Sequence, residues 1–427
     1  MTSAIRLIPV IAVVLVALAA CSEDDPDTNE PAATPAFGLR SEVVTSAERV
    51  SEIAFAPDGR IFFAEQISGN IRILLEDGTL QGQPFATVAV ADYLQLDWGL
   101  TGLALDPDFD ANGYVYALFT EPLNMQDQPS GPTGRPQIVR FTDDNGVGID
   151  RTLISDDFPE TPIEHPGING NGKLHFGADG FLYASMGDYD YNANDAATFS
   201  QDLNSPIGKL LRLDPADGSA APGNPFEANV GVDHRVYAYG FRDPFDFTFA
   251  PGTDTLYATD NTTLTCEELN IIEPGANYGW PAGEFPYADC DAGEQGLVIH
   301  HFARDGMEPT DFVSLVEVSG LAFTSGSRYP SLGDALIVCE SWRSPSADQE
   351  LSSGVLRLIV LGGDQGDEVV SSDAIVRDCR GTVSIAPDGT IYYANDIEIR
   401  TLEIGSIEAG AADAEETQPV PPPITTP

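Results

Sequence analysis

A short pattern of apolar and polar positions occurs six times along the chain. Each copy has an apolar pair, a tight turn rich in Asp and Gly, and a run of alternating aromatic and aliphatic residues. Apolar residues with a period of two indicate strands, and Asp-Gly tolerates the positive φ of a hairpin turn. Each copy therefore predicts two strands joined by a turn. The copies are anchored at Phe55, Leu105, Phe176, Phe249, Phe323 and Ile385.

The spacing of these copies predicts the fold. The anchors are separated by 50, 71, 73, 74 and 62 residues, and repeats at this scale indicate stacked supersecondary units. One sheet with apolar residues on both faces cannot cover itself, whereas six sheets around an axis can. We therefore predict an all-β fold, a six-bladed β-propeller formed by residues 38–407 as one domain. The spacings exceed the roughly 40–45 residues of simple blades, which indicates long loops on the faces, where functional sites usually lie.

The two ends of the chain differ in composition from the repeats. Residues 1–21 contain Arg6, an apolar run over 7–20 and a Leu-Ala-Ala-Cys ending that resembles a bacterial lipobox, so Cys21 is the expected lipidation site. The alternative is a plain secretory signal with an incidental cysteine. Residues 22–37 form an acidic, Pro-rich flexible tether, and residues 408–427 a disordered tail. We expect an exported cell-envelope protein, on its periplasmic or extracellular face, that touches the membrane only through its N-terminal lipid.

Four cysteines remain after Cys21, and an even number in an exported protein favours disulfides. Three pairings are possible. We predict Cys266–Cys290 and Cys339–Cys379 because these pairs are nearest in sequence. A zinc site is not expected, since the chain has no Cys-x-x-Cys and no nearby His cluster.

The charge of the chain limits its partners. Its 67 acids and 20 bases give a formal net charge of −47, so there is no basic surface for nucleic acid. Such acidity is typical of a heavily hydrated surface and also fits a salt-rich habitat, where counterions screen self-repulsion. Some of the acids could instead hold calcium, which prefers oxygen ligands.

Five longer segments carry a resemblance to a known family. Together they resemble the soluble quinoprotein glucose and sorbosone dehydrogenases, which include aldose sugar dehydrogenases, over roughly Ser51 to Ile404. The resemblance implies a six-bladed propeller that uses pyrroloquinoline quinone (PQQ) and calcium to oxidise a small-molecule sugar and reduce an external electron acceptor. The segments are GLTGLALDPDFDANGYVYALFT (99–120), FGADGFLYASMGD (176–188), QDLNSPIGKLLRLDP (201–215), VYAYGFRDPFDFTF (236–249) and EELNIIEPGANYGWP (267–281).

The resemblance also implies two calcium sites. Glu267, Glu268 and the carbonyl of Tyr278 match a structural calcium site, and adjacent carboxylates beside a loop carbonyl suit a hard cation. The alternative there is a turn with solvated acids. Thr262 and Thr263 match the positions whose carbonyls hold the quinone-bound calcium, although the family's usual Gly-Pro is absent.

The cofactor contacts depart from the family pattern. An Arg fork suits the carboxylates of PQQ, and Arg242 stands where the family has the Arg of an Arg-Asn pair. Asp243 replaces the Asn and would repel a trianionic cofactor unless calcium screens it. Arg380 is the single arginine at the family's arginine clamp. A family lysine is missing from the fifth blade, and Trp342 and Arg343 stand near its place.

The expected catalytic base is altered as well. In the family a His before the Leu-x-Phe-Gly strand takes the proton of the sugar hydroxyl, a step that needs a pKa near the operating pH. Asn169 occupies this position and cannot act as a general base. His165, or an acid such as Asp188 or Asp190, is a candidate replacement.

Three functions remain open from the sequence. The first is a sugar dehydrogenase with a relocated base. The second is a calcium-stabilised propeller that binds a carbohydrate or protein without oxidising it, as the non-catalytic hedgehog-interacting relatives in this family imply. The third is a calcium-dependent lactonase, which is disfavoured because the quoted segments match the quinoproteins. Fold alone does not decide among them.

Overall fold

The computed structural model describes most of the chain between residues 38 and 405, all within the unit Phe37–Pro427. Side chains at 124, 342, 343 and 351–353 lie outside this description. The described residues are 38–91, 98–124, 133–160, 169–189, 199–262, 266–281, 296–303, 316–324, 326, 328–330, 332–343 and 351–405.

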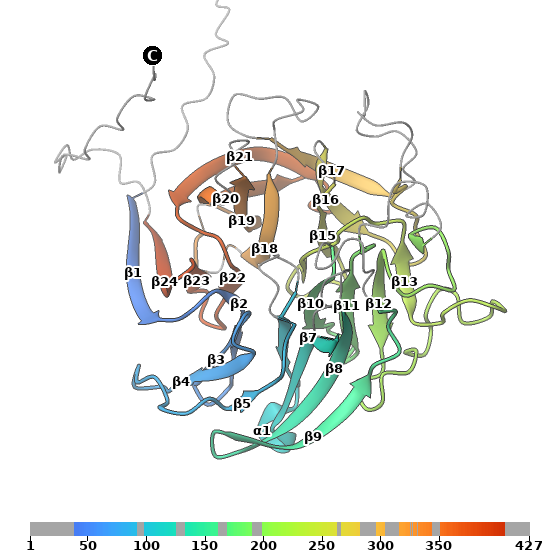
Figure 1. The fold of residues 1–427 in the computed structure, drawn as a ribbon. Coiled ribbons are helices and arrows are strands. Elements are labelled where there is room, and N and C mark those ends of the chain that lie inside the picture. The colour runs from blue at the N-terminus through green and yellow to red at the C-terminus, as the bar shows by residue number, and fades with distance from the viewer. Residues whose placement is uncertain are drawn as a thin grey trace, which may run out of the picture. The chain divides into compact units, whose positions relative to one another are not determined.

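The strands form six four-stranded antiparallel sheets, which are the blades of a β-propeller (Figure 1). The first three blades follow the chain in order. Blade 1 contains β2 (Val50–Phe55), β3 (Ile61–Glu65), β4 (Asn70–Leu74) and β5 (Ala86–Thr87). Blade 2 contains β6 (Leu100–Leu105), β7 (Tyr114–Asn124), β8 (Thr133–Asp144) and β9 (Val147–Ser155). Blade 3 contains β10 (Asn171–Phe176), β11 (Leu182–Met186), β12 (Lys209–Leu213) and β13 (Val236–Tyr239).

The other three blades complete the ring. Blade 4 contains β14 (Phe247–Phe249), β15 (Leu256–Asp260), β16 (Glu267–Ile272) and β17 (Leu297–Phe302). Blade 5 contains β18 (Glu317–Thr324), β19 (Ala335–Arg343), β20 (Leu351–Gly362) and β21 (Glu368–Arg377). Blade 6 contains β22 (Val383–Ile385), β23 (Ile391–Ala394), β24 (Glu398–Gly405) and β1 (Gly38–Ser46).

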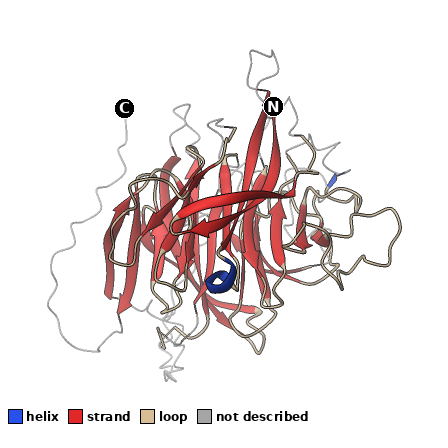
Figure 2. Cartoon of the chain, turned by 90° about the horizontal axis from the view of Figure 1, so that it is seen from below, coloured by secondary structure: helices blue, strands red, loops and turns tan. Residues whose placement is uncertain are grey.

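The repeated pattern corresponds to the first two strands of each blade, which confirms the predicted hairpins and the six-bladed propeller. The anchor residue is the last or second-to-last residue of each first strand, as Phe55 is of β2 and Phe323 is of β18. The first strands of consecutive blades contact one another around the whole ring. The second copy differs in having a short helix, α1 (Phe109–Asn112), in place of a simple turn. Strands make up nearly all the regular structure (Figure 2).

The ring closes through a strand pair that the repeated pattern does not contain. β1, from the start of the propeller, pairs antiparallel with β24 at its end, from Gly38 opposite Gly405 to Ser46 opposite Glu398. Blade 6 is therefore built from both ends of the unit. The pairing supplies the fourth strand of the last blade from the start of the propeller, so the chain that continues from β1 into β2 connects blade 6 to blade 1.

The core lies between the blades. Consecutive residues of a strand face opposite sides of its sheet, so Phe62 packs toward blade 2 and Phe63 toward blade 6. In the same way Leu182 packs toward blade 2 and Tyr183 toward blade 4. A buried apolar cluster fills each of the six interfaces between neighbouring blades. This explains why apolar residues occupy both faces of the repeated strands.

A disulfide joins Cys339 of β19 to Cys379, which precedes β22, and so links blades 5 and 6. This confirms one of the two predicted pairs. Cys266 is also disulfide-bonded, but its predicted partner Cys290 lies outside the described residues, so that pairing stays a prediction. Among the described residues, no helix has the length and apolar character needed to cross a bilayer.

Candidate functional site

The predicted site residues gather where the strands of blades 3 and 4 begin or end. Asn169 precedes β10 by two residues, and Asp188 follows β11 by two residues. Arg242 and Asp243 lie in the connection from blade 3 to blade 4. Asp260 ends β15. In a β-propeller, the loops at one end of the blades lie around the central axis. Side chains at the ends of strands in neighbouring blades are therefore brought close together.

A buried carboxylate, that of Asp188, connects two loops of the site. Asp188 is 1% exposed; the Asn169 amide donates to its Oδ1 at 2.9 Å, and the Trp280 indole donates to its Oδ2 at 2.8 Å. Its backbone N–H donates to the carbonyl of Arg242 at 2.7 Å. Asn169 has φ +48°, a left-handed conformation that Asn tolerates better than most residues. The amide at the family's base position thus orients a carboxylate.

A second buried carboxylate, that of Asp260, fixes the backbone of the Arg242–Asp243 turn. Its Oδ1 accepts the N–H of Asp243 at 2.6 Å, and its Oδ2 accepts the N–H of Arg242 at 3.1 Å. Burial raises the pKa of Asp260 to about 7, although these hydrogen bonds and the Arg242 charge favour the ionised form. The Asp188 carboxylate raises the pKa further. Asp260 is therefore expected to gain or lose its proton near pH 7, and groups with such shifted pKa values are often found at functional sites.

The Arg242 guanidinium is held at the same site. It is 8% exposed, and its Nη1 donates to the carbonyls of Asn261 at 3.0 Å and Thr262 at 2.8 Å. Its carbon Cζ lies 5.8 Å from the centre of the Trp280 ring. The Asp243 carboxylate accepts a 3.3 Å hydrogen bond from the Asn261 amide. The structure thus brings Arg242, Asp243 and Thr262 together with the Asn169–Asp188–Trp280 group.

The predicted calcium ligands occupy different surroundings. Glu267 and Glu268 are adjacent in β16, so their side chains project to opposite faces of the strand. The Glu267 carboxylate is buried, and its Oε2 has no hydrogen-bond partner among the described residues. Burial raises the pKa of Glu267 to about 8; Arg242 opposes this, and Glu317 and Asp260 add to it. The Glu268 carboxylate accepts a 3.4 Å hydrogen bond from the Asn270 amide.

Tyr278 lies in the loop that carries Trp280. Its ring stacks on Phe241 with a centroid distance of 4.6 Å, and its hydroxyl donates to the carbonyl of Ile271 at 2.7 Å. Burial raises the pKa of Tyr278. No group of three or more His, Cys, Asp or Glu side chains arranged to hold a metal occurs in the part of the chain that the structure describes. A cation there would need backbone carbonyls among its ligands, as the sequence predicts for Tyr278 and Thr262.

Arg380 contacts its own blade. Its Nη1 forms an ion pair with Asp396 at 3.1 Å, while its buried Nε has no hydrogen-bond partner among the described residues. It directly follows Cys379 of the disulfide. His165, Asp190 and Thr263, and the side chains of Trp342 and Arg343, lie outside the described residues, so their roles stay predictions.

Sequence reasoning missed Asp260 and Trp280. A signal for Asp260 was present in the repeats, because the second strand of several blades ends at or near an acidic residue. Glu65 ends β3, Asp260 ends β15, and Asp188 follows β11. Trp280 had no comparable signal, because its partner Asp188 is 92 residues away.

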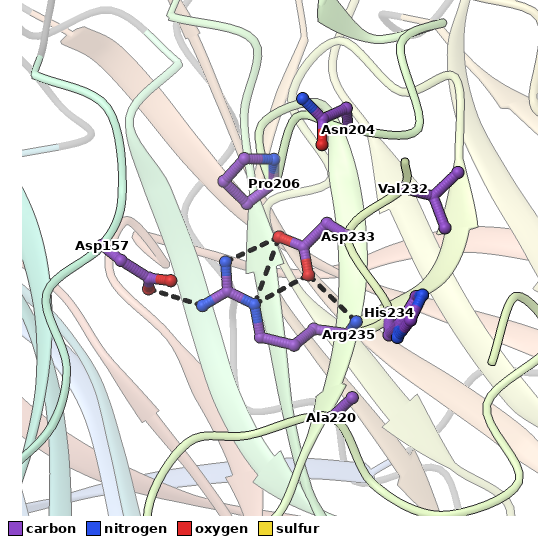
Figure 3. Close-up of a pocket in the computed structure, with 8 residues that line it drawn as sticks. All are labelled: Asp157, Asn204, Pro206, Ala220, Val232, Asp233, His234 and Arg235. Atoms are coloured by element: carbon purple, nitrogen blue, oxygen red, sulfur yellow. Dashed lines mark hydrogen bonds and ion pairs between the residues drawn. The ribbon is translucent and has the colours of Figure 1, made fainter. Parts of the chain in front are cut away.

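A separate depression is lined by residues that follow β9 of blade 2 and residues that flank β12 of blade 3 (Figure 3). It has a volume of about 460 Å³, and Arg235 crosses it. The Arg235 guanidinium binds Asp157 at 2.5 Å and Asp233 at 2.6 Å, so its charge is already paired. None of the predicted site residues lines this depression. It is lined by Asp157, Asn204, Pro206, Ala220, Val232, Asp233, His234 and Arg235.

Comparisons with known proteins agree with this architecture. An aldose sugar dehydrogenase of Escherichia coli is 26% identical over 313 residues, covering 70% of this chain and 74% of that protein. Quinoprotein glucose dehydrogenase B of Acinetobacter calcoaceticus is 28% identical over 262 residues, covering 56% of this chain and 51% of that protein. The PQQ-bound aldose sugar dehydrogenase of Streptomyces coelicolor superimposes with a TM-score of 0.61 at 23% identity, covering 87% of this chain and 100% of that one, which shows a shared fold.

The family assignment rests on most of the propeller. The glucose/sorbosone dehydrogenase family matches residues 48–402, which extend from the end of β1 to the last blade's β24. The match includes the segments around Asn169, Arg242 and Glu267 that build the site. The chain therefore belongs to the glucose/sorbosone dehydrogenase family.

Proposed function

We propose that this protein is a PQQ- and calcium-dependent aldose dehydrogenase in which Asp188 is the catalytic base. The observation that carries the proposal is the buried Asp188 carboxylate, held by Asn169 and Trp280 beside the Arg242 guanidinium. Family membership and the two sugar dehydrogenase relatives support the reaction class. Bound PQQ would accept a hydride from the anomeric carbon of the sugar.

Asp188 has the chemistry that Asn169 lacks. Oxidation of the anomeric carbon to a lactone breaks its C–H bond and the O–H bond of its hydroxyl, and the hydroxyl proton must go to a base. The Asn169 amide donates to one Asp188 oxygen and the Trp280 indole to the other, and an ionised carboxylate can also accept a proton. The two donors also hold the carboxylate in one orientation, which lowers the entropic cost of aligning it with the sugar hydroxyl.

Arg242 supplies positive charge next to this base. Its two carbonyl contacts and the Asp260 carboxylate below its backbone fix its position. A fixed guanidinium suits the carboxylates or carbonyl oxygens of a planar quinone. Because burial raises the pKa of Asp260, protonation there reduces the negative charge that a trianionic cofactor would meet. Arg380, whose Nε has no partner among the described residues, is the second proposed cofactor contact.

The donor set fits calcium. The Oε2 of Glu267 is a buried carboxylate oxygen without a hydrogen-bond partner among the described residues, which is the kind of atom that an ion satisfies. The Thr262 carbonyl accepts a hydrogen bond from Arg242, and a carbonyl oxygen is a hard oxygen ligand of the kind that calcium prefers. We propose Glu267 as a carboxylate ligand and Thr262 as a carbonyl ligand, with Glu268, Tyr278 and Thr263 as further predicted ligands.

Reconstitution tests the reaction. Addition of calcium and PQQ is expected to shift the quinone absorbance and to support dye reduction with at least one member of an aldose panel. Absence of that absorbance shift would refute the proposal. An Asp188→Asn variant should lose about 10²- to 10⁴-fold in kcat, the usual contribution of a general base. Asp77→Asn, in an exposed turn of blade 1, is the matched control and should keep full activity.

Two further variants identify the base. If Asp188 is the base, His165→Ala retains activity; loss of activity in that variant would assign the base to His165. Asn169→His restores the family's residue next to Asp188. A gain of activity only in Asn169→His would show that the natural chain lacks a working base.

The second candidate function is a calcium-stabilised propeller that binds a carbohydrate or protein without oxidising it. Asn169 favours it, because the amide has no basic nitrogen and both Asp188 oxygens already accept hydrogen bonds. This function predicts that a chelator lowers the melting temperature while no aldose is turned over in the presence of calcium and PQQ. Turnover would exclude it.

We also propose that the protein is a lipid-anchored protein of the cell envelope, on the basis of residues 1–21 and the tether that follows. Cys21 and the tether lie outside the described residues. Mass spectrometry of the mature N-terminus should find a diacylglyceryl-modified Cys21. A mature N-terminus that carries no lipid on Cys21, or that begins at another residue, would contradict lipid anchoring at this residue.

A further inference from the structure

Both lysines of this chain are buried. Lys173 and Lys209 have no exposed surface, although lysine is rarely buried fully in proteins. Lys173 has a carboxylate partner, Glu52, at 3.5 Å. The ammonium of Lys209 instead donates to three backbone carbonyls, those of Phe199 at 2.7 Å, Ile207 at 2.8 Å and Ser200 at 2.9 Å. A buried charge held in this way needs an explanation, because desolvating an ammonium costs several kcal/mol.

The three carbonyls belong to one loop, residues 199–207, which connects β11 to β12. Lys209 is the first residue of β12 and pairs with Met186 at the end of β11, two residues before Asp188. Asn204 and Pro206 of this loop line the depression shown in Figure 3. The ammonium binds carbonyls near both ends of the loop. Lys209 therefore determines where this loop lies relative to the end of β11.

The loop in turn holds Trp280. The Nε2 of Gln201 donates to the Trp280 carbonyl at 2.7 Å and to the Asn277 Oδ1 at 3.0 Å. The Asn277 amide donates back to the Gln201 Oε1 at 2.8 Å. The Ser200 carbonyl also accepts the N–H of Gly240, next to the Arg242 turn. Lys209 is thus linked to Trp280 by its hydrogen bond to the Ser200 carbonyl, by the peptide bond from Ser200 to Gln201, and by the Gln201 side chain; the Trp280 indole in turn donates to Asp188.

We propose that Lys209 is a positioning residue for the site, and that its protonation state sets how firmly Trp280 holds the Asp188 carboxylate. A protonated ammonium has three N–H donors for its three carbonyls, whereas a neutral amine has two. Loss of the proton releases one carbonyl of the 199–207 loop and loosens the Gln201 contact with Trp280. The inference rests on the proposed function only in treating Asp188 as the base.

The environment of Lys209 places the loss of its proton near pH 7. Burial lowers the pKa of Lys209 to about 7, while the carboxylates of Asp202, Asp233 and Asp188 favour the charged form. Asp202 lies in the 199–207 loop, Asp233 in the segment before β13, and Asp188 just after the end of β11. These three segments surround the Lys209 ammonium. The site should therefore be firmly ordered below pH 7 and loosen above it.

The first experiment measures the lysine directly. Lysine-selective isotope labelling of the full chain gives two side-chain NMR signals, and Lys209→Met assigns one of them. The Lys209 signal is expected to titrate with a midpoint near 7. Asp202→Asn is the matched control, because the amide keeps the Oδ1 acceptor used by the Asn204 N–H and removes only the charge. It should shift the midpoint to lower pH. A wild-type midpoint near the ordinary lysine value would overturn the protonation change.

The second experiment measures the consequence at Trp280. The chain has three Trp residues, and Trp280→Phe identifies the indole N–H signal of Trp280. This signal should shift with the Lys209 midpoint in the natural chain and lose that pH dependence in Lys209→Met. Gln201→Leu breaks the next link and should abolish the response while Lys209 still titrates. It also tests the inference if Lys209→Met fails to fold.

The outcomes are distinct. Persistence of the Trp280 response in Lys209→Met, or in Gln201→Leu, would assign it to another group such as Asp260 and overturn the positioning role. A Trp280 response that follows Lys209, in a protein that turns over no aldose, would uphold the positioning role and refute the dehydrogenase. In an active enzyme, the pH profile of kcat should lose a step near pH 7 in Lys209→Met.

Discussion

The disulfide between blades 5 and 6 offers a quantitative prediction. Cys339 and Cys379 are 40 residues apart in sequence, and both are buried. For a closed loop of about 40 residues, the lost chain entropy is about 13 cal/mol/K, which corresponds to about 4 kcal/mol at 25 °C. Replacing both cysteines by alanine should therefore lower the free energy of unfolding by about 4 kcal/mol.

The variant should still fold, because backbone hydrogen bonds hold the same segment. The N–H of Asp378 donates to the carbonyl of Gly354 at 2.7 Å, and the N–H groups of Arg380 and Gly381 donate to the carbonyl of Ala394 at 3.1 and 3.2 Å. The loss therefore acts mainly through the unfolded chain, which gains freedom when the bridge is absent.

Calorimetry and urea unfolding of the Cys339→Ala/Cys379→Ala variant measure the effect. With about 2.1 cal/mol/K of unfolding entropy per residue over roughly 370 folded residues, 4 kcal/mol corresponds to a fall of about 5 °C in Tm. A reductant added to the variant reports any contribution from Cys266, which is also disulfide-bonded. A loss below about 1 kcal/mol would refute the entropic reasoning.

Three further predictions concern burial, metal and pH. Phe62→Ala, in the cluster between blades 1 and 2, should cost about 3–5 kcal/mol in urea unfolding; a loss under 1 kcal/mol would contradict the packing. Glu267→Gln should stabilise the calcium-free protein increasingly between pH 4.5 and about 8, because burial raises the pKa of this carboxyl to about 8 and the unfolded chain ionises it at lower pH. The variant should also abolish the rise in Tm on adding calcium; an unchanged calcium effect would remove Glu267 from the ligands. Burial, Arg357 and His301 lower the pKa of His300 to about 4, so the unfolded chain binds a proton between pH 6.5 and 4 that the folded chain does not. Stability should fall as the pH is lowered through that window, and His300→Gln should recover about 3 kcal/mol of the loss at pH 4, measured by urea unfolding; parallel pH profiles would refute this.

The residues at which this site departs from the family pattern are hydrogen-bonded to neighbouring groups of the site. Asn169 donates to Asp188, and Asp260 binds the backbone of Arg242 and of Asp243. The carboxylates of Asp188, Asp243 and Asp260 at the proposed cofactor site are therefore hydrogen-bonded to neighbouring donors, which limits their repulsion of an anionic ligand. A weak salt dependence of PQQ affinity would agree with this; affinity that rises steeply with modest added salt would indicate unscreened repulsion by these carboxylates instead.

Much of the fold could be predicted from the sequence because its information is local. An inner hairpin such as Val50–Glu65 contains its own alternation and its own turn, and both faces are apolar because each packs on a different neighbouring blade. The number of hairpins then gave the number of blades. The Cys339–Cys379 bridge was also predictable, since few pairings exist for so few cysteines.

The tertiary structure decided the contacts that join distant segments. No local pattern pairs residue 38 with residue 405, aims the Trp280 indole at Asp188, or places Asp260 beneath the Arg242 turn. The sequence showed that the family's base was replaced by Asn169, whereas only the structure showed which carboxylate that amide holds. The repeated alternation determines strands and blade count through interactions between near neighbours. The chemistry of the site depends on which loops the closed ring brings to one end, and that is a property of the assembled propeller.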